Sequence, residues 1–273
     1  MNCKSILLNL DIDGPVAPVT KAAIELAAAH QARLIGFCAA EAPLPMAYPE
    51  GGAMFVEAWQ QMRTDIGTRF KEMRREFEKL VPRSIDSEWR DALETPTQAL
   101  VGASRSADLL VMRAAKGAST GDAYRVAEPG SVVLQAGRPL LVLSDAGGHM
   151  PPKKIVVAWR DTREARRAVS DAVPLLRMAD DVTVVTVSHA MNEAVRQSAA
   201  DVVTFLARHG VRSHSELLEG NDDSEELLGF LAAADADLVV SGAYGHSRLR
   251  EWAFGGVTRS LLDTAKFNRF LSS

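Results

Sequence analysis

The residues best suited to chemistry lie in one stretch near the C-terminus, Ser241–Leu262. It follows the apolar run Leu238–Val240, which is typical of a buried strand, and it ends in the helix-like segment Val257–Leu262. Its glycines follow the spacing G-x2-G-x9-G-G and are Gly242, Gly245, Gly255 and Gly256. Glycine permits positive φ angles and close backbone approach. A strand, a glycine loop and a helix start together offer backbone N–H groups and a helix dipole that can hold a phosphate.

Charge in the same stretch favours an anion, because Arg248, Arg250 and Arg259 outnumber Glu251. His246 could donate a hydrogen bond to a ligand phosphate, although a loop histidine without such a role fits equally well. Short glycine motifs are weak signals. Two interpretations therefore stay open: a phosphate-binding loop, or glycines that end a strand and cap helices.

Other chemistry has little support in the sequence. The six histidines are scattered without metal-ligand spacing, and neither a Gly-x-Ser-x-Gly elbow nor a Gly-Lys-[Ser/Thr] loop occurs. Asp161, Asp222 and Asp223 could support a metal beside a nucleotide, but turns and helix starts attract aspartate anyway. Cys38 has no recognisable base beside it. We predict no catalytic residue and no metal ligand, and slow ATP hydrolysis is the most enzymatic activity that we expect.

Bulk properties are those of an ordinary globular protein. The chain has 273 residues, 47% hydrophobic and 24% charged, with a net charge of −4 and two cysteines. The acidic balance argues against a nucleic-acid partner. Two cysteines argue against a disulfide framework. With no apolar run of membrane-spanning length and no signal-peptide core at the start, the sequence predicts a cytoplasmic protein that does not contact membranes.

The elements that would position the glycine stretch alternate between strand and helix in the first half of the chain. An apolar stripe at steps of three and four predicts one long amphipathic helix. The expected strands are Ser5–Leu10, Arg33–Cys38, Ser84–Arg90, Leu109–Met112 and Pro139–Leu143; the expected helices are Thr20–His30, Phe55–Leu80, Pro96–Ser104 and Gly130–Leu134. Alternation of this kind predicts a mainly parallel sheet covered by helices on both faces.

The same order then starts again after a linker-like segment, Asp145–Pro152. The expected strands are Lys154–Trp159, Val182–Val187, Arg212–Leu218, Leu238–Ser241 and a weak Asn268–Ser272; the expected helices are Thr162–Ala179, Glu193–His209, Ser224–Ala234 and Val257–Leu262. This internal repeat predicts two domains of one topology, residues 1–145 and 152–273.

With two copies of this order and the glycine spacing in the second, the chain resembles a tandem universal stress protein over nearly its whole length. The resemblance implies an α/β fold of two flavodoxin-like (Rossmann-like), doubly wound, mainly parallel five-stranded sheets. It also implies an internal pseudo-dimer in which Pro139–Leu143 faces Asn268–Ser272. Many members bind ATP through a G-x2-G-x9-G-[S/T] motif after the fourth strand.

Carried over position by position, the resemblance implies a nucleotide site in the second half. Gly256 replaces the motif's hydroxyl residue, whereas Thr258 retains a hydroxyl nearby. Arg160 replaces the acidic residue after the first strand, and its guanidinium could either bind a phosphate or fill the nucleoside site. The implied site residues are Arg160, Val187, Gly242, Gly245, His246, Gly255, Gly256, Val257 and Thr258.

The first half departs from the family motif at other positions than the second half does. Asp11 keeps the acidic position and Gly130-Ser131 keeps the end of the motif, but Arg113 and Lys116 replace its first two glycines and Val133 replaces the later hydroxyl residue. Because side chains stand where the backbone must approach a phosphate, we expect no nucleotide in this half.

Three functions remain in competition. The first is a stress-response regulatory protein that binds ATP, with Mg²⁺, or a related adenine nucleotide in its C-terminal domain. The second is a scaffold that has lost nucleotide binding and acts through protein partners, which is favoured by Arg113, Lys116, Arg160 and Gly256. The third, an enzyme acting on another anionic small molecule in the first half, rests on Asp11 and the loop Ala42–Gly52. All three are compatible with the internal pseudo-dimer and with a further homodimer.

Overall fold

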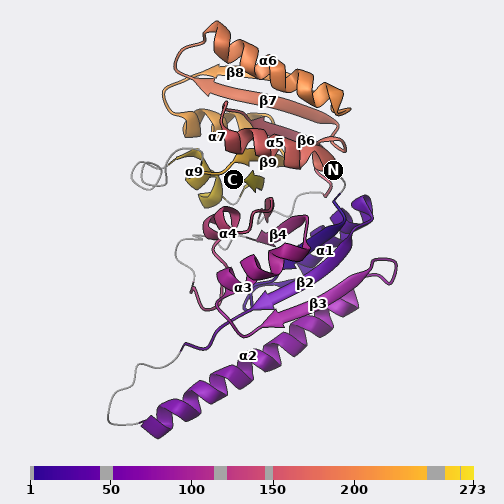
Figure 1. Cartoon of the computed structure of the whole chain (residues 1–273), viewed down its shortest axis with the longest axis vertical. Coiled ribbons are helices and arrows are strands. Elements are labelled where there is room, and N and C mark those ends of the chain that lie inside the picture. Colours follow the sequence, from indigo (N-terminus) through magenta and orange to yellow (C-terminus); the bar gives the residue numbers. More distant parts are fainter. Residues whose placement is uncertain (1–2, 44–51, 114–121, 145–149, 245–255, 265) are drawn as a thin grey trace.

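The strands of the protein form one ten-stranded sheet, as seen in a computed structural model that describes residues 3–43, 52–113, 122–144, 150–244, 256–264 and 266–273 (Figure 1). Its strand order is β3-β2-β1-β4-β5-β10-β9-β6-β7-β8. Each half has the order 3-2-1-4-5 of a Rossmann-like doubly wound sheet. The second half repeats this order in reverse across the centre of the sheet. Among the described residues no helix is both long and apolar enough to cross a membrane.

The first half alternates strands and helices as expected. Its strands are β1 (Ser5–Asn9), β2 (Arg33–Ala39), β3 (Ser87–Ala92), β4 (Leu109–Arg113) and β5 (Leu140–Leu143); its helices are α1 (Val16–His30), α2 (Gly52–Leu80), α3 (Pro96–Ala103) and α4 (Pro129–Gln135), with a 3₁₀ turn η1 (Ser104–Ser106). The third strand was expected at Ser84–Arg90, but β3 begins three residues later, at Ser87. The reason is a turn in which the amide of Ile85 donates to the carbonyl of Pro82.

The second half repeats this pattern. Its strands are β6 (Lys154–Ala158), β7 (Asp181–Ser188), β8 (His214–Glu219), β9 (Leu238–Gly242) and β10 (Asn268–Ser272); its helices are α5 (Arg163–Leu176), α6 (Glu193–Arg208), α7 (Asp223–Ala233) and α9 (Val257–Asp263). Side chains cap three of these helices at their starts, with Thr162, Asn192 and Asp222 accepting hydrogen bonds from first-turn amides.

The two halves join through their fifth strands. β5 and β10 pair antiparallel, with Arg269 opposite Val142 and Leu271 opposite Leu140, whereas the other strand pairs are parallel. The expected facing of these two segments is therefore confirmed. β10, expected to be weak, is instead a central strand in which all five residues are buried.

Helices cover both faces of the sheet, and the strand side chains alternate between them. Ile6 and Leu8 of β1 pack with α1 and α2 on one face, where α5 and α6 also lie, whereas Leu7 packs on the other with α3 and α4. In the second half that other face is covered by α7 and α9. This layering leaves the carboxyl ends of the strands for the loops that carry the predicted site residues.

Candidate functional site

The chain order reverses between β6 and β9, which are neighbours in the sheet although two strands, β7 and β8, separate them in the chain. In doubly wound sheets a ligand binds in the crevice at such a reversal, outside the carboxyl ends of the strands. Arg160 follows β6 and Gly242 ends β9, so the structure brings these two predicted site residues to this edge. Three others, Gly245, His246 and Gly255, lie outside the described residues.

Gly256 stands at the N-cap of α9, where its own carbonyl accepts hydrogen bonds from the amides of Arg259 and Ser260. Among the described residues, no side chain caps this helix. The first amides of a helix have no partner within the helix itself, so those of Val257 and Thr258 have none there. The start of α9 can therefore receive an acceptor from outside.

Gly242 has a packing role in addition to the ligand-binding role that its motif position predicts. A Cβ atom built on it would lie 2.5 Å from the backbone nitrogen of Ala165 and 2.7 Å from the carbonyl carbon of Glu164. Both atoms belong to the first turn of α5. The bare backbone at Gly242 is thus required for packing of β9 against α5, whatever else it contacts.

The Thr258 hydroxyl is engaged within the protein. Thr258 is 3% exposed, and its Oγ1 accepts a hydrogen bond from the backbone amide of Tyr244 at 3.2 Å. This contact ties the first turn of α9 to the residue that follows β9.

Arg160 points toward the start of α7. Its Nη1 lies 3.0 Å from a carboxylate oxygen of Asp223. Its side chain is 63% exposed, so this ion pair adds little to stability. Of the other aspartates considered for a metal, Asp222 caps α7 and Asp161 binds Arg166. Within the described ranges, no three His, Cys, Asp or Glu side chains form a group that could hold a metal ion.

Val187 and Val257, both predicted site residues, are half-buried against one apolar cluster. They pack with Ala158 and Leu218 on the face that α7 and α9 cover. The structure therefore gathers Val187, Val257 and the start of α9 on one side of the sheet edge, with the Arg160–Asp223 pair at the start of α7.

In the first half, the equivalent helix start is closed by a side chain that sequence reasoning missed. Glu128 caps α4, and its carboxylate accepts hydrogen bonds from the amides of Gly130, at 2.8 Å, and Ser131. The available signal was an acidic residue immediately before Pro129, which occupies the first helical position. Tyr244 also reaches this point, since a Cβ on Gly130 would lie 2.3 Å from its hydroxyl oxygen.

Asp11 is the buried acid of the first half. Burial raises its pKa to about 6, although the Asn9 side-chain amide at 3.1 Å and the nearby positive charge of Arg113 oppose that shift. Close by, Asp13 forms an ion pair with Arg125, which lowers the pKa of Asp13. Burial raises the pKa of Cys38 beyond the physiological range, and its thiol contacts the sulfur of Met73 instead of a base.

The model of the Universal stress protein family matches residues 190–268. This segment includes β8, α7, β9, α9 and the whole glycine stretch. The match agrees with the sequence-based resemblance over this segment. The segment contains Gly242 and the start of α9, whereas Arg160 and Val187 precede it.

Solved structures extend the likeness to the whole chain. A universal stress protein from Archaeoglobus fulgidus aligns with a TM-score of 0.65 at 12% identity, over 98% of this chain and 96% of that one. A functionally unknown protein from Pseudomonas aeruginosa PAO1 aligns with a TM-score of 0.57 at 16% identity, over 99% and 92%.

The cytoplasmic domain of a prokaryotic cation chloride cotransporter aligns with a TM-score of 0.53 at 12% identity, over 98% of this chain and 94% of that one. No protein with curated annotation matches the sequence. The whole-chain alignments show a shared α/β fold. At identities this low they leave the ligand of this protein to be inferred from its own residues.

Proposed function

We propose that the chain is a regulatory binding protein that takes ATP or a related adenine nucleotide in its C-terminal half, with little or no turnover. The ligand would lie at the carboxyl edge of β6, β7 and β9. Its phosphates would meet the start of α9 and its nucleoside would lie toward Val187. Binding would then set the conformation of this carboxyl edge and, through it, the choice of protein partner.

One observation carries this proposal: no described side chain caps the start of α9, whereas that of α4 is closed by Glu128. A helix start with available amides and a positive dipole end favours an anion. Its place beside the β6–β9 reversal is the place where ligands bind in this class of sheet.

A second function, a scaffold that binds no nucleotide, is favoured by two other observations. The Thr258 hydroxyl already accepts the Tyr244 amide, and the Arg160 guanidinium already pairs with Asp223. Both groups would have to exchange these partners to contact a phosphate. A scaffold would act through its surfaces alone.

The test is titration calorimetry with ATP and AMP on the wild-type chain and on Gly256→Asp. The new carboxylate would cap α9 as Glu128 caps α4, so we expect it to reduce ATP affinity by at least about tenfold while keeping the fold. The matched control is Thr204→Asp, which adds the same charge at an exposed position of α6 on the opposite face.

Each outcome has a definite meaning. Binding that is lost in Gly256→Asp and kept in Thr204→Asp supports the nucleotide site at α9. Equal affinity in both variants would place the nucleotide elsewhere. No heat with either nucleotide at millimolar concentration would favour the scaffold.

A further inference from the structure

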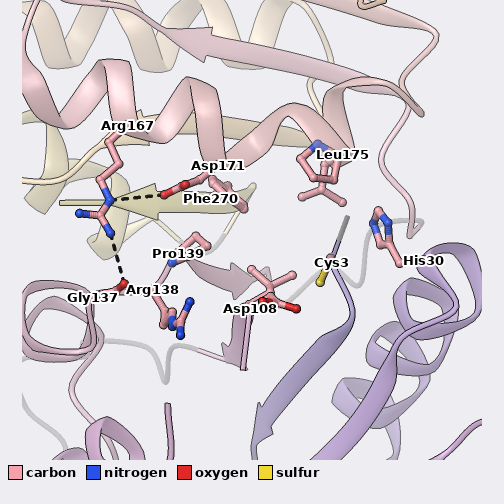
Figure 2. Close-up of a pocket in the computed structure, with 12 residues that line it drawn as sticks. Cys3, His30, Asp108, Gly137, Arg138, Pro139, Arg167, Asp171, Leu175 and Phe270 are labelled. Carbon is pink, nitrogen blue, oxygen red and sulfur yellow. Dashed lines mark hydrogen bonds and ion pairs between the residues drawn. The ribbon is translucent and has the colours of Figure 1, made fainter. Parts of the chain in front are cut away.

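A cavity of about 140 Å³ lies between the two halves, on the face of the sheet that α1 and α5 cover (Figure 2). The first half contributes the starts of β1, β4 and β5 and the end of α1. The second half contributes α5 and Phe270 of β10. Its volume is close to that of a protein cavity that holds one benzene molecule.

Much of the wall of this cavity is apolar. Leu109, Pro139, Pro174, Leu175 and Phe270 line it. Cys3 adds to the apolar surface, since burial and the nearby charge of Asp108 raise the pKa of its thiol to about 12 and keep it protonated. These walls suit a flat hydrocarbon body.

The two acids in the wall are already satisfied. Asp108 accepts the backbone amides of Lys4 and Ser5 at 2.8 and 3.0 Å. Asp171 accepts the hydroxyl of Ser272 at 2.9 Å and lies 3.6 Å from Arg167. Figure 2 shows that pair at one end of the cavity, where Arg167 also donates to the carbonyl of Gly137.

Arg138 is the charged group of the wall that remains unmatched. It is exposed, and among the described residues its guanidinium has neither an ion-pair nor a hydrogen-bond partner. An arginine fork binds a carboxylate through two parallel hydrogen bonds. Arg138 therefore offers donors to a carboxylate, although the carboxylate of Asp108 also keeps its charge in this wall.

His30 offers a hydrogen-bonding atom at the end of the cavity opposite Arg167 (Figure 2). Its Nε2 is buried and has no partner in the described part of the chain. Burial, together with the charge of Lys4, lowers the pKa of this imidazole, so the ring is neutral at neutral pH. Buried polar atoms are almost always hydrogen-bonded, which makes this nitrogen a candidate contact for a ligand.

We propose that this cavity binds a small organic anion with a ring-sized apolar body, its carboxylate on Arg138 and a distal polar group on His30. The ligand would contact both halves and stabilise their junction by mass action. The proposal is independent of nucleotide binding, because the cavity lies on the face of the sheet that α1 and α5 cover, whereas Val187 and the start of α9 lie on the other face.

The test uses calorimetry and ligand-observed NMR with benzoate, 4-hydroxybenzoate and the neutral analogue benzamide. On the wild-type chain we expect both carboxylates to bind at millimolar concentration, 4-hydroxybenzoate more tightly, and benzamide at least about tenfold more weakly than benzoate. Arg138→Gln should weaken benzoate by about tenfold and leave benzamide unchanged. Because Arg138 is exposed, this variant should fold normally.

Two further variants locate the ligand. His30→Phe should remove the advantage of 4-hydroxybenzoate over benzoate, because only the hydroxyl needs Nε2. Arg105→Gln, which makes the same charge change at an exposed residue outside the cavity, should bind all three probes like the wild type. Absence of binding, equal binding of benzoate and benzamide, or an unchanged benzoate affinity in Arg138→Gln would overturn the proposal.

Discussion

The starts of α4 and α9 occupy equivalent places in the two halves but differ in their N-cap residues. At α4, the amides of Gly130 and Ser131 are held by the carboxylate of Glu128. At α9, the N-cap is Gly256, which has no side chain to offer. The carboxylate of Glu128 thus occupies the helix start in the first half, whereas the N-cap residue of α9 provides no such group.

The residues that follow the first strand of each half differ in the same way. The backbone register is equal, since Leu10 donates to the carbonyl of Phe37 at 2.8 Å and Trp159 donates to that of Val185 at 2.7 Å. The next residue is a buried acid in one half, Asp11, and an exposed cation in the other, Arg160.

The topology and the ligand-facing side chains vary independently between the two halves of this protein. Both halves share one strand order and one backbone register, yet a few side chains at the carboxyl edge reverse the local charge. Acidic groups in the first half disfavour an anion, and the start of α9, which no described side chain caps, favours one. Fold alone therefore does not assign the same ligand to both halves.

The largest effect is expected at the last residue of the fourth strand, which is Arg113 in the first half and Gly242 in the second. Gly242→Ala places a Cβ atom 2.5 Å from the backbone of α5, and backbone cannot yield as a side-chain tip can. We expect the free energy of unfolding to fall by about 3 kcal/mol, as measured by chemical denaturation.

The matched control is Gly229→Ala in α7, where a Cβ would meet no atom within 4 Å. That change should raise the unfolding free energy by up to about 1 kcal/mol, because alanine is the better helix former. If Gly242→Ala were as stable as the wild type, α5 would not confine this position, and a ligand-contact role would explain the glycine better.

Most of the fold could be predicted from the sequence, because alternating apolar strands and amphipathic helices carry a local signal. The central, buried position of β10 could not be predicted. Its segment begins with Asn268 and Arg269, which read as exposed polar residues. Both are buried because they bond to distant backbone: Asn268 accepts the amide of Ser144, and Arg269 donates to the carbonyl of Leu143. Such contacts span more than 100 residues and leave no local pattern.

The candidate site was predicted less well for the same physical reason. The sequence identified the glycine stretch and Arg160, but neither the cap by Glu128 nor the approach of Tyr244 to Gly130 follows from spacing. Whether a motif residue faces a ligand or its own protein depends on what the other elements place beside it. Gly242 shows this, since its neighbour in space is the start of α5.

The second prediction uses the contrast between Asp11 and Arg160. Because burial raises the pKa of Asp11 from 3.8 to about 6, ionising it costs more in the folded protein than in the unfolded chain. Stability therefore falls as pH rises from about 4 to 6. Asp11→Asn should raise the unfolding free energy by about 2 kcal/mol above that range and leave it unchanged below about pH 4.

Arg160→Gln is the control in the second half. Its side chain is exposed and its ion pair with Asp223 is a surface pair, so the unfolding free energy should change by less than about 0.5 kcal/mol. Denaturation curves across the pH range give both differences. A stability gain in Asp11→Asn that stayed constant with pH would mean that the carboxyl is not the buried acid described above.

The smallest effect concerns the comparison of the two helix starts itself. Glu128→Ala leaves the amides of Gly130 and Ser131 to water, and the loss of one cap should lower the unfolding free energy by about 1 kcal/mol. Asp222→Ala, which removes the cap of α7 in the other half, should cost a similar amount. Glu128→Gln keeps an acceptor oxygen without the charge and should fall between wild type and Glu128→Ala. If all three variants matched the wild type, water would satisfy these amides as well as a carboxylate does. The difference between α4 and α9 would then carry no preference for an anion.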